Sequence, residues 1–399
     1  MRPTTTDAMR TTLHSESSAA PASITRRAAL LGGAVLLAPF SARLAAATPA
    51  SAAAVSLDDA RPTLIRLDSN ENPYGPSPAA RSAIAASIPA GCRYADGDLE
   101  PLKKALATQE QVAPSHVVLG SGSSELLHMA ALLAAESGPG GELVAAKPTF
   151  EDLEEFAAKF GVTTRWVPVD ANHRHDLAAM RAALTPQTRL VYVCNPNNPT
   201  GTIVGRRELE TFIRSVPATT LVLVDEAYLD FVTAADAGSV VPLIKDCPNL
   251  LVLRTFSKLH GLAGMRMGYG FATPQLVKRL EDKQLAFPNV AALRAALASL
   301  GDHAFLSDTR RRILGDRTRL EDFVDRLGYA RAQSQGNFVF FEVRQPIVEF
   351  KQAMLTRGIS VGRPFAGYDQ WCRLTVGTGP EIDRVLAVMP EVLKSSAKS

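Results

Sequence analysis

Short apolar runs recur along the chain from Leu64 onward, separated by longer segments in which apolar and polar residues alternate with helical spacing. Such runs are typical of buried strands, and the segments between them are long enough to be crossover helices. Because strands alternate with helices, the pattern predicts an α/β fold with a mostly parallel sheet flanked by helices. The predicted strands are Val117 to Leu119, Leu143 to Ala146, Thr163 to Val167, Leu190 to Cys194, Leu221 to Val224, Leu250 to Leu253 and Met267 to Phe271.

The pattern changes after Pro274. The chain up to Leu327 has helical spacing without a strong strand, and beyond it short strands are predicted over 337–343, 359–361 and 372–376, with a helix over 347–357. This mixture is typical of an α+β domain. We therefore predict a large domain over 73–290, a smaller C-terminal α+β domain over 291–399, and an N-terminal arm over 48–72 that can cross onto the smaller domain.

Residues 1–47 have the three parts of a signal peptide. Arg26 and Arg27 precede an apolar run from Ala28 to Phe40, and small residues follow at Ala45 to Ala47. The run is too short for a stable membrane span, and the paired arginines resemble a twin-arginine export signal, although Ala28 and Ala29 depart from the bulky residues usual there. We expect export by the twin-arginine machinery to the periplasm or outside the cell. The alternative is a disordered extension on a cytoplasmic enzyme.

Composition and charge exclude several classes of function. The 43 basic and 40 acidic residues leave a net charge of +3, and no dense basic patch with interleaved aromatic residues suggests a nucleic-acid partner. The four cysteines lie far apart, without the spacing of a zinc site or a disulfide scaffold, so we expect free and mostly buried thiols. His173 and His175 have no further ligands at metal-site spacing, and we expect no metal.

Polar and small residues follow five of the predicted strands at the point where each strand ends. In open α/β sheets, ligands gather at the carboxyl edge, so these segments are expected to converge on one site. The segments are Gly120 to Ser124, Lys147 to Phe150, Asn195 to Gly201, Asp225 to Tyr228 and Thr255 to Lys258.

Lys258 and Asp225 carry the predicted chemistry. A single lysine is most often a surface residue, but Lys258 ends the string Thr-Phe-Ser-Lys and is followed by flexible glycines. Asp225 directly follows a fully apolar strand, where an unpaired carboxylate is costly and needs a cationic partner. A protonated pyridine nitrogen is such a partner, and an acid there keeps the ring of pyridoxal 5'-phosphate (PLP) an electron sink. The alternative is an Asp that caps the next helix.

Two further segments fit a phosphorylated cofactor. In Asn195 to Gly201, the string Asn-Pro-Asn-Asn-Pro-Thr-Gly forms a rigid turn whose side-chain amide can hydrogen-bond the phenolic oxygen of the ring. The segment Gly120 to Ser124 precedes a helix that is expected to begin near Glu125, and its free backbone N–H groups suit a phosphate. The alternative is that these residues only cap the helix. Ser257 and Arg266 can add phosphate contacts.

In order and spacing, these pieces resemble the fold type I PLP-dependent aminotransferases of class I and II, and within them the histidinol-phosphate aminotransferase family. The resemblance runs from about Leu67 to Val388. Its strings are Asn70 to Pro78, Arg93 to Gly97, Asn195 to Gly201, Asp225 to Tyr228, Thr255 to Gly264 and Cys372 to Gly377.

The resemblance implies a role for individual residues. Lys258 would carry PLP in Schiff-base linkage and shuttle a proton, and Asp225 would pair with the pyridine nitrogen. Phe150 would stack on the ring, and Tyr94 would reach the cofactor of the neighbouring subunit in a homodimer. The phenolic oxygen would be held by Asn198 and Tyr228, the phosphate by Ser123, Ser124, Ser257 and Arg266, and the substrate's carboxylate or phosphate by Arg373, with Arg363 and Tyr74 near the same end.

The implied activity is transfer of an amino group between an amino acid, such as glutamate, and a keto acceptor. Phe150 stands where family members often have Tyr, which keeps the stacking surface and loses a hydroxyl. Export would separate the enzyme from cytoplasmic histidine biosynthesis, so the acceptor is predicted only as an imidazole or aromatic keto compound with an anionic tail. Other possibilities are an aromatic-amino-acid aminotransferase, a decarboxylase of the phosphothreonine type, and a binding protein that kept the fold.

Overall fold

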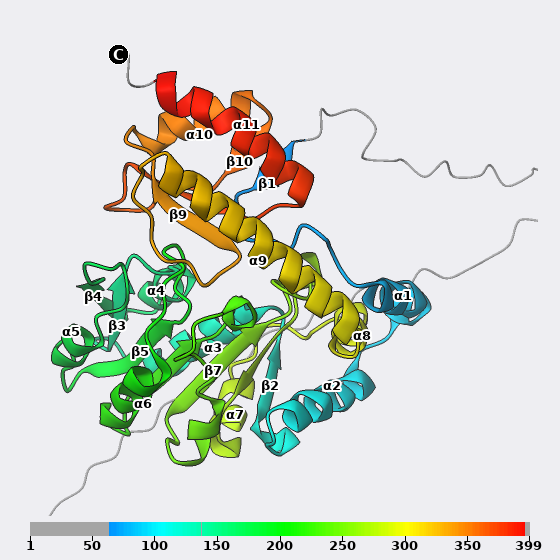
Figure 1. Ribbon diagram of the computed structural model, residues 1–399. Helices are drawn as coiled ribbons and strands as arrows, with labels where there is room; N and C mark the ends of the chain where they lie inside the picture. The colour runs from blue at the N-terminus through cyan, green and yellow to red at the C-terminus, as the bar shows by residue number, and fades with distance from the viewer. Residues whose placement is uncertain (1–63, 137, 396–399) are drawn as a thin grey trace, which may run out of the picture. The chain divides into compact units, whose positions relative to one another are not determined.

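The computed structural model describes residues 64–136 and 138–395, all within the compact unit Ala60–Ser399 (Figure 1). The predicted export segment, residues 1–47, lies outside the described residues, as does most of the predicted arm. Within the ranges described, no helix is long and apolar enough to cross a membrane.

A seven-stranded sheet forms the centre of the larger part of this unit. Its strand order is β2-β8-β7-β6-β5-β3-β4, and every neighbouring pair is parallel except those made by β8, which runs antiparallel to β2 and β7. The predicted α/β fold with a mostly parallel sheet is confirmed. The strands are β2 (Val117–Gly120), β3 (Glu142–Lys147), β4 (Thr163–Pro168), β5 (Thr188–Cys194), β6 (Leu221–Asp225), β7 (Leu250–Thr255) and β8 (Gly268–Phe271).

The central strands are apolar on both faces because helices cover both faces. Adjacent residues of β5, such as Val191 and Tyr192, belong to two different buried clusters on opposite sides of the sheet. The cluster containing Tyr192 is covered by α3 (Ser123–Ala135), α4 (Asp152–Ala158) and α7 (Pro274–Glu281). The cluster containing Val191 is covered by α1 (Pro78–Ser87), α2 (Asp96–Gln109), α5 (Leu177–Ala182), α6 (Arg206–Ser215) and α8 (Val290–Leu300).

The remaining elements surround a second core. The antiparallel pair β9 (Phe338–Glu342) and β11 (Trp371–Thr375) packs with α9 (His303–Arg326), α10 (Ile347–Thr356) and α11 (Gly379–Ser395). In Figure 1, α9 runs from these elements down to α8. The short strand β1 (Ile65–Leu67) pairs in parallel with β10 (Ile359–Val361), so the segment before Pro73 does cross onto the C-terminal part.

The predicted domain division at 290/291 falls at the start of α8. Buried side chains of α8, among them Ala292, Leu293 and Leu300, belong to the same cluster as the strands of the large sheet. The second core begins with α9, where Ile313 and Leu320 are buried. Helix α8 therefore packs with the large sheet, while the division itself stays a prediction.

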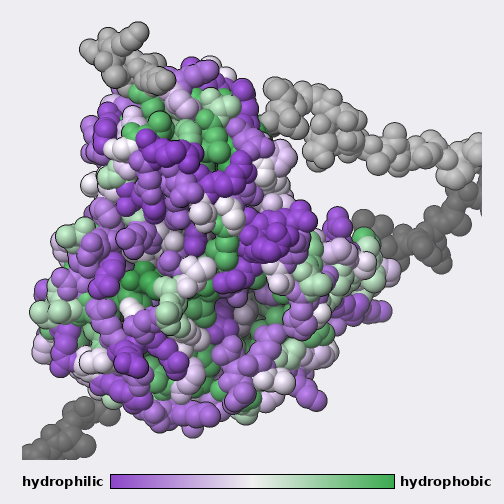
Figure 2. Space-filling model, in the orientation of Figure 1, coloured by the Kyte–Doolittle hydropathy of each residue, from purple (hydrophilic) through white to green (hydrophobic). Residues whose placement is uncertain are grey.

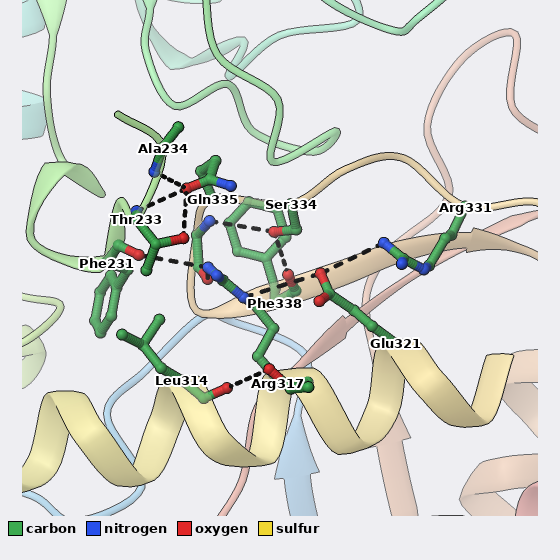
Figure 3. Close-up of polar contacts among 12 residues, drawn as sticks. Phe231, Thr233, Ala234, Leu314, Arg317, Glu321, Arg331, Ser334, Gln335 and Phe338 are labelled. Atoms are coloured by element: carbon green, nitrogen blue, oxygen red, sulfur yellow. Dashed lines mark hydrogen bonds and ion pairs between the residues drawn. The ribbon is translucent and has the colours of Figure 1, made fainter. Parts of the chain in front are cut away.

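Buried Arg317 of α9 holds two segments of the second core together (Figure 3). Its guanidinium donates to the backbone carbonyl of Gly336 at 3.0 Å and to that of Phe231 at 3.4 Å. Phe231 belongs to the segment directly after β6, and Gly336 to the loop before β9. Because buried carbonyls need donors, this arginine holds both segments against α9.

The surface in the view of Figure 2 is mostly hydrophilic, with smaller hydrophobic areas between the polar side chains. The four cysteines are free thiols; Cys194, Cys247 and Cys372 are buried and Cys92 is exposed.

Candidate active site

A cavity of about 630 Å³ opens at the carboxyl ends of the parallel strands. It receives residues from the segments after β2, β3, β5, β6 and β7, as the sequence predicted, and others from before β2 and from the C-terminal part. Predicted site residues that line it are Ser123, Ser124, Phe150, Asn198, Asp225, Tyr228, Ser257, Lys258, Arg266, Arg363 and Arg373.

Lys258 follows β7 and turns into the cavity. Its Nζ lies 3.5 Å from the backbone oxygen of Ser69 and 5.3 Å from the centre of the Tyr228 ring. Burial, followed by the positive charge of Arg373, lowers the pKa of this amine from 10.5 to about 8. An appreciable fraction of Lys258 is therefore a neutral nucleophile near neutral pH.

Asp225 is the last residue of β6 and is 3% exposed. Its Oδ1 accepts the backbone N–H of Ala227 at 3.0 Å, and its Oδ2 accepts the hydroxyl of Tyr192 at 3.3 Å. No salt bridge joins it to Lys, Arg or His among the residues described, and burial raises its pKa from 3.8 to about 6. A buried carboxylate without an ion pair suits a cationic ring nitrogen.

The start of α3 forms one end of the cavity. The helix begins at Ser123, two residues before the predicted start near Glu125. Gly122 has a φ of +88°, and a Cβ there would lie 2.2 Å from Nη2 of Arg266, so only glycine admits the guanidinium this close. A Cβ at Gly268 would likewise lie 2.2 Å from the backbone nitrogen of Ser123. Backbone N–H groups, hydroxyls and an arginine thus converge as a phosphate requires.

Tyr228 and Asn198 lie between Lys258 and the C-terminal part. The Tyr228 hydroxyl accepts Nδ2 of Asn70 at 3.0 Å, and burial raises the pKa of this phenol. Oδ1 of Asn198 accepts Nη1 of Arg373 at 2.6 Å. Both side chains are therefore oriented by partners from segments far away in the sequence.

The two arginines from the C-terminal part differ in their partners. Arg373, 7% exposed, donates to Asn198 and, at 2.5 Å, to the backbone oxygen of Asp68; no carboxylate pairs with it among the residues described, and its Nε has no partner there. Arg363 pairs with Glu151 at 2.8 Å. The uncompensated charge of Arg373 favours an anionic ligand.

Tyr74 and Tyr94 do not line this cavity. Tyr74 packs against the C-terminal core, with the Arg312 guanidinium 5.5 Å from its ring centre. Tyr94 is 92% exposed and borders a different cavity. The role predicted for Tyr94, in the site of a neighbouring subunit, concerns a chain outside this structure.

The cavity also contains residues to which sequence reasoning assigned no role. Asn70 and Glu71 stood within a string of the family resemblance, but only the fold brings Asn70 to Tyr228. Asp68 offers a backbone oxygen to Arg373, a contact with no sequence signal. Lys351 reaches the cavity from α10, where helical spacing alone shows only a polar position. Within the described ranges, no set of three His, Cys, Asp or Glu side chains could hold a metal ion.

Comparison with known proteins agrees with this geometry. Residues 62–389 match the model of the family described as aminotransferase class I and II. The chain belongs to this family. It is 40% identical to a histidinol-phosphate aminotransferase from Moorella thermoacetica over 83% of this chain and 86% of that protein. A second one, from Shouchella clausii, is 38% identical over 83% of this chain and 90% of its own length.

Solved structures extend the likeness to the fold and cofactor. The crystal structure of histidinol-phosphate aminotransferase from Sinorhizobium meliloti in complex with pyridoxal-5'-phosphate is similar at a TM-score of 0.78 and 29% identity, covering 84% of this chain and 92% of that one. The chain is thus a PLP-dependent aminotransferase with the fold of the type I PLP transferases. The predictions of family, fold, activity and cofactor are confirmed, and the decarboxylase and binding-protein possibilities are not favoured.

Proposed function

We propose that the cavity holds PLP with Lys258 as its covalent attachment point and Asp225 at the ring nitrogen. The observation that carries this proposal is the presence of both groups in one cavity, an amine of lowered pKa and a buried carboxylate without an ion pair among the described residues. The amine can bind the aldehyde of the cofactor, and the carboxylate can pair with the nitrogen at the opposite end of its ring.

PLP, when bound, supplies an aldehyde that takes up the amino group and a ring that withdraws electrons from the substrate's α-carbon. Lys258 attaches the cofactor and then, as a neutral amine, moves a proton to and from the α-carbon. Asp225 keeps a proton on the ring nitrogen. Phe150 covers one ring face, while Asn198 and Tyr228 orient the phenolic oxygen.

The phosphate is proposed to lie against the start of α3. Ser123 and Ser124 offer backbone N–H groups and hydroxyls, Ser257 adds a hydroxyl, and Arg266 adds a charged donor beside Gly122. With the phosphate anchored there and the ring nitrogen at Asp225, the position of the aldehyde relative to Lys258 is determined.

The proposed acceptor is an imidazole or aromatic keto compound with a carboxylate or phosphate tail, and the donor is an amino acid such as glutamate. The uncompensated charge of Arg373, with Arg363 and Lys351 on the same cavity, supports an anionic substrate. The names of the relatives support a histidinol-phosphate-like compound. Tyr74 is proposed only to support the C-terminal wall, because it does not line the cavity.

Absorbance of the purified protein tests the cofactor site. We expect a visible band of bound PLP that borohydride converts to a stable adduct on Lys258. The Lys258→Ala variant should form no adduct, whereas the matched control Lys278→Ala, on the exposed face of α7, should behave as the unaltered protein does. An adduct in Lys258→Ala would refute this attachment point.

A panel of donors and acceptors tests the substrate. The enzyme is incubated with glutamate or aspartate and with 2-oxo acids that carry a neutral, carboxylate or phosphate tail, and also with histidinol phosphate and 2-oxoglutarate. We expect amino-group transfer, with preference for tails that carry a second anion. Release of carbon dioxide in place of keto acid would instead indicate a decarboxylase.

A homodimer is proposed because an apolar surface surrounds Tyr94. Large hydrophobic side chains are unusually exposed there, and a cavity of about 1010 Å³ lies between their segments. An exposed apolar group of this kind is typical of a protein interface. The side chains are Ile88 at 73%, Tyr94 at 92%, Leu285 at 56% and Phe287 at 74% exposure.

Export is proposed from the sequence of residues 1–47 alone. Arg26 and Arg27 before the apolar run support a twin-arginine signal and a periplasmic or secreted enzyme. Cells that express the full chain, or the variant with Arg26→Lys and Arg27→Lys, would be fractionated. We expect shortened enzyme in the periplasm only from the unaltered chain. Equal distribution of both would support the cytoplasmic alternative.

A further inference from the structure

A buried hydroxyl lies behind the carboxylate of Asp225. In the pairing of β5 with β6, Cys194 lies beside Asp225, and Tyr192 lies beside Leu223. Since alternate residues of a strand share a face, Tyr192, Cys194 and Asp225 all point to the side covered by α3 and α4. From there the Tyr192 hydroxyl reaches Oδ2 of Asp225 at 3.3 Å.

Packing does not account for this hydroxyl. The Tyr192 side chain is 0% exposed, and its neighbours on this face include Leu190, Leu223 and Leu251, against which a phenylalanine would pack as well. A buried hydroxyl is costly unless it is hydrogen-bonded. Its polar neighbours are Asp225, the Cys194 thiol and the carboxyl group of Glu154.

The two oxygens of Asp225 have separate donors. Ala227 N–H holds Oδ1, and Tyr192 O–H holds Oδ2. One donor on each oxygen fixes the plane of the carboxylate about its Cβ–Cγ bond, and both bonds stabilise its charged form.

We propose that Tyr192 is a positioning residue for Asp225: its hydroxyl holds the carboxylate charged and oriented toward the ring nitrogen of PLP. This inference rests on the proposed function of Asp225. It assigns Tyr192 a role through Asp225, because Tyr192 itself does not line the cavity.

Other groups near Asp225 keep their influence when Tyr192 is changed. Asp225 is affected by the amine of Lys258 and by the adjacent Glu226, and Tyr192 is affected in turn by Glu154 of α4. The test must therefore compare variants that leave these groups in place, among them Lys258, Glu226, Cys194 and Glu154.

The test is release of PLP from the holoenzyme on dilution, followed by visible absorbance over a range of pH that extends from neutral to acid. Loss of a hydrogen bond to a charged group should weaken PLP binding by about 10-fold in Tyr192→Phe. Without this donor the pKa of Asp225 rises further, so affinity should begin to fall at higher pH than in the unaltered enzyme, as protonated Asp225 cannot pair with the ring nitrogen.

Tyr269→Phe is the matched control. Tyr269 is a buried tyrosine of β8, 6% exposed, whose hydroxyl interacts with Arg254 and whose side chain belongs to the cluster on the other face of the sheet. It should retain the affinity and the pH profile of the unaltered enzyme. A Tyr192→Phe protein that matches the unaltered enzyme, or equal losses in both variants, would overturn the proposal.

A double-mutant cycle separates positioning from general damage. In an Asp225→Asn background, Tyr192→Phe should change PLP affinity little, because the hydroxyl no longer has a carboxylate to hold in its charged form. Additive losses would contradict the proposal. Failure of the proposed function has a different signature, since the unaltered enzyme would then form no borohydride adduct on Lys258.

Discussion

Glu151 is the residue that distinguishes Arg363 from Arg373, the two arginines that the C-terminal part places at the cavity. It follows Phe150 directly and pairs with Arg363 at 2.8 Å, while Arg373 has no carboxylate partner among the residues described. The pair is partly exposed, so its contribution to stability is small, but its position decides how much positive charge a substrate meets. A second anionic group on the substrate must compete with Glu151 for Arg363.

Replacing Glu151 by glutamine should favour doubly anionic acceptors. We expect KM for acceptors with an anionic tail to fall about 3- to 10-fold, with KM for neutral-tailed acceptors unchanged, because the internal competitor is removed. Steady-state kinetics with paired acceptors measure this. Glu155→Gln, an equal charge change on the exposed side of α4, is the control; a similar fall in that variant, or equal falls for both acceptors, would contradict the prediction.

Helix α4 also carries a buried acid, Glu154. Glu154 is 3% exposed, neither of its oxygens has a hydrogen-bond partner among the described residues, and burial raises its pKa from 4.5 to about 8. The carboxyl is therefore protonated in the folded protein at neutral pH. Its neighbours include Tyr192 and Cys194, so α4 places an uncharged carboxyl group behind the cavity.

Glu154 should make stability depend on pH. In the folded state the Glu154 carboxyl keeps its proton up to about pH 8, whereas in the unfolded chain it loses this proton near pH 4.5. The contribution of Glu154 to the free energy of unfolding is therefore fully present below pH 4.5 and is lost as the pH rises to 8. In Glu154→Gln this loss, of about 2–4 kcal/mol, should be absent. Urea unfolding at pH 5 and pH 8.5 measures it. Glu155→Gln should keep the original slope, and an unchanged slope in Glu154→Gln would refute the assignment.

Arg317 fixes helix α9 to its neighbouring segments through hydrogen bonds to buried backbone carbonyls (Figure 3). The Arg317→Met variant leaves the carbonyls of Phe231 and Gly336 without this donor and should lower the free energy of unfolding by about 2–4 kcal/mol. Arg311→Met, on the exposed side of the same helix, should change it by less than about 0.5 kcal/mol. Thermal or urea unfolding compares them; equal effects would show that the buried contacts contribute nothing.

At the scale of the whole molecule, the most exposed large hydrophobic side chain among the residues described gives the test of assembly. Tyr94 lies on the apolar surface with Ile88 and Phe287, outside the cavity of its own chain. If two chains share their sites, a residue on this surface completes the cavity of the partner. Two differently inactivated chains can then form one intact site.

Mixing Lys258→Ala chains with Tyr94→Ala chains should restore activity. Each pure variant should have little activity, whereas a mixed dimer has one site with both Lys258 and Tyr94, so refolded mixtures should regain up to about a quarter of the unaltered activity by the statistics of pairing. Size-exclusion chromatography with light scattering measures the mass. No recovery in a mixture that does form dimers would show that Tyr94 does not serve the partner's site.

Much of this protein was determined by local sequence. The seven strands of the large sheet were predicted from the sequence. The signal is strongest in the central strands, because a strand buried on both faces must be apolar throughout, whereas β4 at the edge of the sheet is mostly exposed. Lys258, Asp225, Asn198 and Arg266 were predicted at the site because each follows or flanks a strand, and parallel strands end at one edge. The start of α3 was predicted two residues late, since Ser123 and Ser124 are poor markers of a helix interior.

Only the tertiary structure decided the contacts between distant segments. Asn70 meets Tyr228, Arg373 meets Asn198, and Glu151 meets Arg363, across separations that no local pattern records. In the sequence Tyr192 is one more apolar position of a strand, and only the folded structure shows that its hydroxyl donates to Asp225. Local sequence determines which residues are buried or follow a strand; chain packing alone determines which of them face one another.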